Sequence, residues 1–434
     1  MPVRPIVLLT VLTTLLVSAT STAQISLRDL PDLARKRADR LRPLQIAALE
    51  PFWADLSLDY ETNSAILDKS IAKAAKLGDS VVPLLLEKLK PTQGGALSRN
   101  LAGNCRRVLQ RLDPASFVDA LAEMARGKNY LAKSQSIILL GYAEVPQAAT
   151  VLNDLLSSAP KELRLPIIRS LRLLRSPKGA AQIVALLGSS DSKLREEVLA
   201  YLIAAKASGV VETVIQALET EGNNRLLPSY IDYFATCASR NAAATEALLP
   251  LLDRERIDWQ DTRRLVRVLA TIAPKGHELT TRKLHELIDG NDTSSLAVQA
   301  AVSLRDLGDK KGVRDLNRTL DDKIRRRKRE AALYEQRASL LFAIDDFTAA
   351  LSDYDKILDY SEGAAMTRRA YVGLLKCESR RNKIQSIVKH MKSSGMSPEE
   401  FQDLAEQDEP FRKSIEHNRV QSFLKQLTKD RAPK

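Results

Sequence analysis

The chain has 434 residues and a formal net charge of +12, because 66 lysines and arginines outnumber 54 aspartates and glutamates. Aromatic residues make up only 5% of the chain, which favours helices packed through Leu and Ala and argues against an all-β fold. The three cysteines, Cys105, Cys237 and Cys377, are too few and too widely spaced for a disulfide-built domain. We expect buried thiols, and whether any two of them pair stays open.

The first 23 residues have the order of a secretory signal peptide. Arg4 precedes an apolar run, residues 6–19, and small residues follow at 21–23. The run is shorter than the roughly 20 residues that a membrane-spanning helix needs. We therefore expect cleavage after Ala23 and export of the chain to the periplasm or the extracellular space, with a retained anchor as the alternative. No later apolar run is long enough to predict a transmembrane span in the mature chain.

Residues 24–64 are predicted to form N-terminal capping helices. Residues 27–41 are rich in Arg and Asp and are typical of an exposed helix, whereas Pro51, Phe52 and Trp53 bring bulky apolar side chains. The open end of a helical array has to be shielded from water, so these three residues are expected to cover the first repeat. A binding role for Trp53 is the alternative.

Residues 65–320 repeat themselves with a period of 31 to 36 residues. Two apolar series of this period interleave, which predicts two helices per repeat and a stack of helical hairpins. One series marks Leu-rich helix ends and the other marks the helices between them. The first series passes through Leu155, Leu186, Leu218, Leu251, Leu287 and Leu320, and the second through Leu140, Leu171, Leu202, Phe234, Leu269 and Leu304.

The segment 191–221 illustrates one such hairpin. Asp191 is a predicted N-cap, and the apolar residues from Leu194 to Ile203 form one helical stripe. Residues 207–209, Ala-Ser-Gly, break the helix before a second stripe begins at Val210. Neither helix can bury its stripe alone, so we expect each hairpin to be buried by its neighbours.

Several motifs in this region resemble the HEAT-repeat family. Asp191-Ser-Lys-Leu-Arg195 opens a helix, residues 297–309 are the most regular copy, and Gly179 and Gly312 stand where second helices begin. The resemblance covers residues 65–320 and implies a right-handed α-solenoid. The units at 222–252 and 253–289 depart from the pattern. HEAT arrays serve many partners, so the resemblance implies protein binding without naming the partner.

Residues 321–330 form a basic junction after the array. Six of the seven residues from 323 to 329 are basic, and we expect them to open the next helix. A solvated helix start that keeps the linker exposed is the first interpretation, and an anionic partner is the alternative, which the unfavourable interaction of positive charge with the helix dipole slightly supports. Nucleic acid is disfavoured by export and by the few aromatic residues. The candidate partner-binding residues here are Lys323, Arg325, Arg326, Arg327, Lys328 and Arg329.

Another pattern begins at residue 331. Its apolar and small residues predict helices over 330–343 and 346–359, separated by Asp345-Asp346. The sequence of residues 331–364 resembles a tetratricopeptide (TPR) repeat, and the sequence of residues 365–396 resembles a second, degenerate copy. Arg337, Ile357 and Glu362 depart from the family pattern. Two copies are too few for a free-standing array, so this TPR-like module is expected to dock on the HEAT-like array.

The inner helix of the TPR-like module supplies three further candidate partner-binding residues, Glu335, Ser339 and Phe342. Some TPR domains hold a peptide carboxylate with Lys and Asn on this helix. Glu335 and Ser339 occupy the matching positions here and cannot form that clamp. Residues 397–434 are expected to be C-terminal capping helices with a frayed end.

No catalytic motif accompanies the repeats. His277 and His285 lack metal-ligand spacing, and there is no C-x-x-C, nucleophile-elbow or phosphate-loop sequence. We therefore predict no catalytic residue, cofactor or metal. The predicted function is a non-catalytic protein–protein interaction scaffold or adaptor in a bacterial cell envelope or secreted space. The alternatives are a binder of phospholipid, polysaccharide or acidic protein through residues 323–329, and an accessory subunit of an envelope enzyme.

Overall fold

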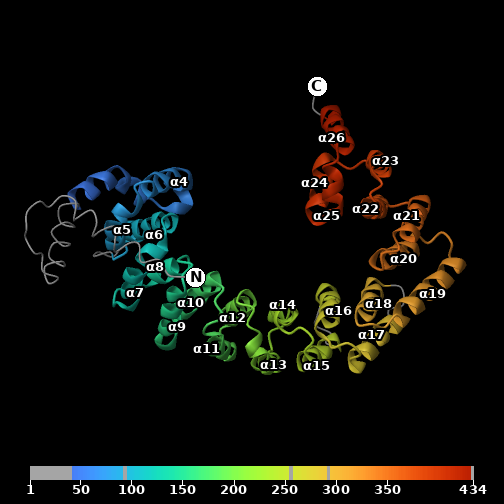
Figure 1. Ribbon diagram of the computed structural model, residues 1–434, viewed down its shortest axis with the longest axis horizontal. Coiled ribbons are helices and arrows are strands. Elements are labelled where there is room, and N and C mark those ends of the chain that lie inside the picture. The colour runs from blue at the N-terminus through green and yellow to red at the C-terminus, as the bar shows by residue number, and fades with distance from the viewer. Residues whose placement is uncertain (1–41, 91–94, 254–257, 291–293, 432–434) are drawn as a thin grey trace, which may run out of the picture. The chain divides into compact units, whose positions relative to one another are not determined.

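The computed structural model describes residues 42–90, 95–253, 258–290 and 294–431. All regular secondary structure in these ranges is helical (Figure 1), which confirms the predicted all-α class. The chain divides into two compact units, Met1–Leu174 and Arg175–Lys434. The predicted signal peptide, the start of the N-terminal cap and the last three residues lie outside the described ranges. None of the described helices has the length and apolar character needed to cross a membrane.

The first unit is a double layer of helices. Helices α4, α6, α8 and α10 contact one another in series, while α5, α7 and α9 form the other layer. Residues 42–49 are also helical. The further elements of this unit are η1 (Glu50–Phe52), α3 (Trp53–Leu56), α4 (Tyr60–Ala75), η2 (Gly78–Val81), α5 (Val82–Lys88), α6 (Ala96–Arg111), η3 (Pro114–Phe117), α7 (Val118–Arg126), α8 (Tyr130–Leu140), α9 (Pro146–Ser158) and α10 (Lys161–Leu174).

The first helices of this unit are tied to the layer by side chains. Asn104 of α6 is 1% exposed and donates hydrogen bonds of 2.9 Å to the carbonyls of Leu56 and Leu58. Trp53 is half-buried, and the Lys88 ammonium lies 5.4 Å from its ring centre. Trp53 thus lies beside Lys88 of α5.

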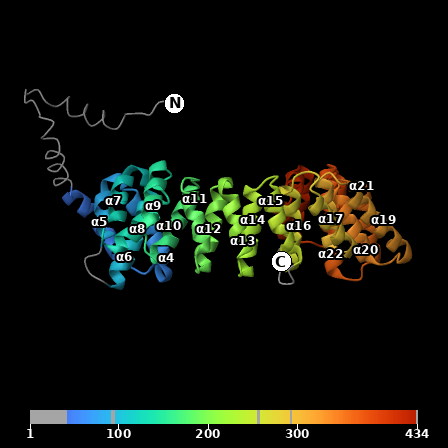
Figure 2. The same ribbon diagram turned by 90° about the horizontal axis from the view of Figure 1, so that it is seen from below.

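The second unit contains the remaining helices, which Figure 2 shows from below. They are α11 (Ala180–Ile183), η4 (Val184–Gly188), α12 (Ser192–Ala204), η5 (Ser208–Val210), α13 (Val211–Glu219), η6 (Asn224–Leu226), α14 (Leu227–Cys237), α15 (Ala242–Leu248), η7 (Leu249–Asp253), α16 (Trp259–Ile272), α17 (Glu278–Gly290), α18 (Ser295–Asp306), α19 (Lys311–Arg326), α20 (Ala331–Ala343), α21 (Phe347–Tyr360), α22 (Ala364–Arg380), α23 (Ile384–Ser394), α24 (Pro398–Gln407), α25 (Glu409–Ile415) and α26 (Asn418–Arg431).

Helices of the second unit also pack in two layers. Helices α12, α14, α16, α18 and α20 contact one another in series, whereas α13 contacts α15 and α17 contacts α19 (Figure 1). Consecutive helices such as α17 and α18, or α20 and α21, join the layers. Each of these helices therefore packs against other helices close to it in the sequence.

The two helices predicted within 191–221 are present as α12 and α13. The Asp191 carboxylate caps α12 by accepting hydrogen bonds from the backbone N–H groups of Lys193 and Leu194 at 2.9 and 3.3 Å. Arg195 makes two 3.0 Å contacts with the Glu221 carboxylate, whose side chain is only 3% exposed. Arg195 thus links the beginning of α12 to the segment that follows α13.

The helices predicted over 330–343 and 346–359 are confirmed as α20 and α21, within one residue at each end. Asp346 caps α21 by accepting a hydrogen bond of 3.1 Å from the Ala349 N–H. One hydrophobic core runs without interruption from Val266 on α16 to Cys377 on α22. The TPR-like helices therefore share a core with the helices before them.

The C-terminal helices close the second unit. Apolar residues from α22 to α26, among them Phe401 and Phe411, form a separate core cluster. Arg380 of α22 makes an ion pair of 3.0 Å with Asp408, whose carboxylate also accepts a hydrogen bond from the Phe411 N–H. These contacts fasten the predicted C-terminal cap to α22.

The basic junction differs from the prediction. Residues 323–326 do not open a helix but form the last turn of α19, and Arg327 is its C-cap residue. The helix continues because Leu316, Leu320 and Ile324 extend its buried stripe. Positive charge at a helix C-terminus is stabilising, so the dipole argument for an anionic partner is wrong.

Candidate functional site

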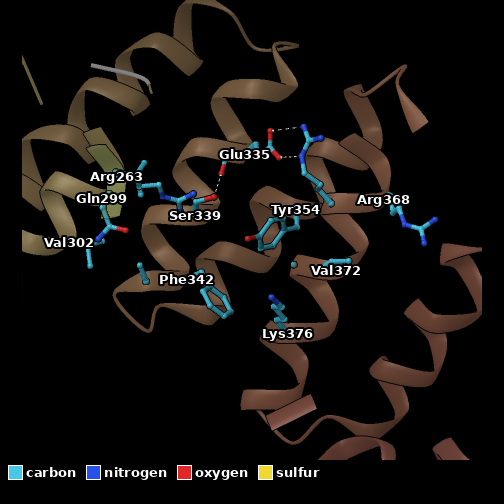
Figure 3. A pocket seen from close by; sticks show the side chains of 14 residues that line it. Arg263, Gln299, Val302, Glu335, Ser339, Phe342, Tyr354, Arg368, Val372 and Lys376 are labelled. Atoms are coloured by element: carbon cyan, nitrogen blue, oxygen red, sulfur yellow. Dashed lines mark hydrogen bonds and ion pairs between the residues drawn. The ribbon is translucent and has the colours of Figure 1, made fainter. Parts of the chain in front are cut away.

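A cavity of about 660 Å³ lies on the α16–α18–α20–α22 side of the second unit. Its lining side chains recur three or four residues apart, which puts them on one face of each helix. They come from α16, α18, α20 and α22, with one residue from α21 (Figure 3). The lining residues are Arg263, Val298, Gln299, Val302, Glu335, Ser339, Phe342, Ala343, Tyr354, Arg368, Arg369, Val372, Gly373 and Lys376.

The floor of this pocket depends on a close approach between Tyr354 and Gly373. A Cβ atom on Gly373 would lie 2.3 Å from the Tyr354 ring, so only glycine lets α21 and α22 pack this closely. Burial raises the pKa of the Tyr354 hydroxyl, and a hydrogen bond with the Ser339 side chain opposes that rise. The Ser339 hydroxyl also donates a hydrogen bond of 2.8 Å to the Glu335 carbonyl.

The pocket carries four basic side chains and one acidic side chain. Glu335 accepts hydrogen bonds of 2.5 and 3.2 Å from Arg369, and this interaction raises the pKa of the arginine. Arg368 is paired with Glu400 of α24. Arg263 and Lys376 have no hydrogen-bond or ion-pair partner for their side-chain nitrogens within the described residues. The pocket therefore presents two uncompensated cations.

Those two cations stand on opposite walls. Arg263 comes from α16 and Lys376 from α22, as Figure 3 shows. The lining also carries apolar side chains, among them Val298, Val302 and Phe342, together with the polar Gln299 and Ser339. An occupant would therefore meet apolar and polar side chains as well as positive charge.

The Phe342 ring packs against the Arg380 side chain. The Arg380 guanidinium lies 4.6 Å from the Phe342 ring centre and 6.0 Å from that of Phe347. Because Arg380 is also paired with Asp408, the C-terminal helices support this wall of the pocket. The prediction of a purely capping role for these helices did not anticipate that contact.

A second ion-pair network fixes α20 between its neighbours. Arg337, one of the departures from the TPR pattern, hydrogen-bonds to both oxygens of Asp353 at 2.6 and 2.8 Å and also pairs with Asp321 of α19. The hydrogen bonds to Asp353 raise the pKa of Arg337. Burial raises the pKa of the Asp353 carboxyl, and Arg337 opposes that rise. This network joins α19, α20 and α21.

The structure brings together only some of the predicted site residues. Glu335, Ser339 and Phe342 all line the pocket. None of the six basic residues of the run 323–329 is among its lining residues. Five of them are exposed, and two of those are partly neutralised, Arg325 by Asp322 at 3.5 Å and Arg327 by Glu330 at 3.0 Å.

Sequence reasoning missed Arg263, Val298, Val302 and Lys376. They lie on helices far apart in the sequence, and only the stacking of α16, α18, α20 and α22 brings them to one pocket. The one available signal was their spacing of about one helical turn from other pocket residues, such as Val298 to Val302.

The three cysteines are buried, and two of the histidines contact neighbouring side chains. Cys105, Cys237 and Cys377 are buried and unpaired, and burial raises the pKa of their thiols to about 12, 11 and 12. His285 contacts Asp309 at 2.7 Å, and His277 contacts Thr280 at 2.9 Å. Within the described ranges, no group of three or more His, Cys, Asp or Glu side chains could hold a metal ion.

Comparison with known proteins adds little. No protein-family model matches the chain, and no curated protein matches it. One solved structure, the crystal structure of an engineered protein from a structural genomics consortium, has a TM-score of 0.39 and 18% sequence identity to this chain. The match covers 87% of this chain and 99% of the engineered one. A TM-score this low supports no conclusion about family or function.

Proposed function

We propose that the protein is an exported, non-catalytic interaction scaffold that binds a partner protein in the pocket lined by α16, α18, α20 and α22. In this proposal the helices form a right-handed α-solenoid, HEAT-like up to α19 and TPR-like from α20. The observation that carries the proposal is the pair of uncompensated cations, Arg263 and Lys376, in a pocket that also carries apolar side chains. Charge and apolar surface in one concave site are typical of recognition.

The polar groups of the pocket favour binding over catalysis. The Glu335 carboxylate is occupied by Arg369, and the Ser339 hydroxyl donates to a backbone carbonyl. A nucleophile needs a base within hydrogen-bond reach, and no histidine, aspartate or cysteine lines the pocket. Export rests on the signal-peptide pattern of residues 1–23, which predicts a partner in the envelope or outside the cell.

A second candidate function uses the basic run 323–329. Arg326, Lys328 and Arg329 are exposed and have no side-chain partner within the described residues, so they could contact phospholipid, polysaccharide or acidic protein. The position of the run at the end of α19 already accounts for its charge, because cations there offset the helix dipole. We therefore rank this function second.

Affinity capture with a blocked pocket tests the proposal. Ser339 is exposed within the pocket, so Ser339→Trp should fill the cavity, and a circular-dichroism melt checks that loss of the hydrogen bond to Tyr354 leaves the chain folded. The matched control is Arg318→Trp on α19, where the native side chain is 75% exposed and not part of the pocket. From an envelope fraction of the native cells, the wild type and the control should retain a stoichiometric protein that Ser339→Trp loses. Equal recovery by all three proteins would refute the pocket as the binding site.

A further inference from the structure

Resting on the proposed function, we infer that the binding surface continues from the pocket along α16 to Trp259, and that its occupant is an acidic segment of the partner protein with an aromatic or large aliphatic residue among its acids. Trp259, Arg263 and Arg267 are exposed and stand one turn apart on α16. We call these three residues the α16 strip. Arg263 is the member that lines the pocket (Figure 3).

The contacts of α16 show which way the strip faces. Arg264 pairs with an aspartate of α14, whereas the Val266 carbonyl accepts a hydrogen bond of 3.1 Å from the Ser303 hydroxyl of α18. Successive residues turn by roughly 100° about a helix axis, which puts Trp259 roughly 20° from Val266, roughly 40° from Arg263 and roughly 140° from Arg264. Trp259 therefore lies on the α18 side of the exposed face, the side on which Arg263 meets the pocket.

The side chains of the strip are unpartnered within the part of the chain that the structure describes. The Trp259 side chain is 64% exposed, and its indole makes no hydrogen bond or ring contact there. The guanidinium groups of Arg263 and Arg267 have no hydrogen-bond or ion-pair partner there either. Asp258, the acid next to the strip, caps α16 by accepting a hydrogen bond of 2.8 Å from the Asp261 N–H. The strip thus offers one indole and two positive charges to an occupant.

Charge complementarity selects the chemistry of that occupant. Side chains one turn apart have Cβ atoms about 5–6 Å from each other, so the two arginines attract a segment that carries more than one carboxylate. The indole adds a large flat surface that an aromatic or aliphatic side chain can cover, and Trp and Arg are the residue types most enriched among those that dominate binding energies. Val298 and Phe342 extend this apolar surface into the pocket, which favours a peptide with apolar side chains over an acidic polysaccharide.

A peptide array probed with the full-length chain tests the inference. Each acetylated and amidated heptapeptide carries Phe, Leu or Ser at its centre and a combination of Glu and Gln at the other six positions. The wild type should select Phe or Leu at the centre and Glu over Gln around it. Loss of the indole in Trp259→Ser, or of the charge in Arg263→Gln, should weaken the best peptide by about tenfold or more.

Tyr130→Ser is the matched control for Trp259→Ser. Tyr130 is likewise the first residue of its helix and is 56% exposed, but it belongs to α8 in the first unit. Arg318→Gln on α19 serves in the same way for Arg263→Gln, because Arg318 does not line the pocket. Both controls should bind the best peptide as the wild type does, and circular-dichroism melts should show that all four variants are folded.

Tryptophan fluorescence reports on the strip directly, because the chain has only two tryptophans. In a Trp53→Phe background all indole emission comes from Trp259. The best peptide should shift this emission to shorter wavelength and protect it from quenching by acrylamide, whereas the same peptide with Gln in place of every Glu should not.

Three results would overturn the inference. They are peptide binding that Trp259→Ser leaves unchanged, a Trp259 that the bound peptide does not protect, and an array without selection. Retention on alginate, an acidic polysaccharide, without peptide selection would assign the strip to polysaccharide and overturn it as well. If the array shows no selection while Ser339→Trp still abolishes partner capture, the inference fails and the proposed function stands. Partner capture that Ser339→Trp leaves unchanged would refute the proposed function, whatever the array selects.

Discussion

Arg337 offers the sharpest test of how the TPR-like helices are joined to those before them. Replacing it with leucine, the kind of residue the TPR pattern prefers, leaves the Asp353 carboxyl buried at 2% exposure without its partner. Removing one partner of a buried ion pair costs about 3–5 kcal/mol. Because the Arg337 side chain is 21% exposed, we expect the lower end, about 3 kcal/mol, for Arg337→Leu.

The double variant Arg337→Leu/Asp353→Leu should recover most of that loss. Apolar replacement of both partners of a buried pair is often neutral or stabilising, so we expect it within about 1 kcal/mol of the wild type. Urea unfolding followed by circular dichroism gives the free energies for a double-mutant cycle. Hydrogen exchange of α19–α22 amides would assign the change to the second unit. If the single-variant losses simply add in the double variant, the two side chains are not coupled and the reasoning is wrong.

Three further predictions concern local structure. Gly373→Ala should destabilise the second unit by about 1–3 kcal/mol because its Cβ would overlap the Tyr354 ring. Gly103→Ala should instead stabilise α6 by about 0.5–1 kcal/mol, because its Cβ would meet no atom closer than 3.7 Å. Equal urea midpoints for the two variants would contradict this prediction. Asp191→Ala should lower the free energy of unfolding by about 1 kcal/mol through loss of the α12 cap, and Asp191→Ser should retain most of that stability. An Asp191→Ala variant as stable as the wild type would contradict this prediction. Burial lowers the pKa of His390 from 6.5, so the unfolded chain binds the proton more readily and stability falls as pH drops below 6.5. Urea midpoints at about pH 7.5 and 5.5 should therefore differ less in His390→Gln than in the wild type, and an unchanged difference would exclude the histidine as the cause.

Local patterns in the sequence predict much of this fold. Asp191 is a short acceptor before an apolar stripe, and its side chain caps α12 as expected. Asp345-Asp346 separates two stripes, and the turn between α20 and α21 falls there. Such signals depend only on residues a few positions apart, which is why the helix bounds of this region are predicted to within one residue.

The junction shows where a local pattern was misinterpreted. Assigning residues 321–330 to a linker followed the change of repeat style, but the buried stripe through Leu320 and Ile324 carries α19 on to Arg326. Periodicity, rather than the density of charge, marked the end of that helix. The position of the basic run then reverses the sign of its interaction with the helix dipole.

Only part of the pocket could be predicted. Glu335, Ser339 and Phe342 share one face of one helix, and the TPR resemblance singled out that face. Arg263 and Lys376 join them through the packing of four helices spread over more than 100 residues of chain. Whether a surface arginine keeps a free charge also depends on tertiary neighbours, as Arg369 shows by pairing with Glu335.

The most direct test of binding in this pocket is photo-cross-linking in the cells that make the protein. A photoreactive phenylalanine analogue replaces either Ser339 in the pocket or Arg318 on α19. We predict a discrete protein adduct from position 339 and none from position 318. An adduct from position 318 alone, or none from position 339, would contradict the central claim that this pocket binds the partner.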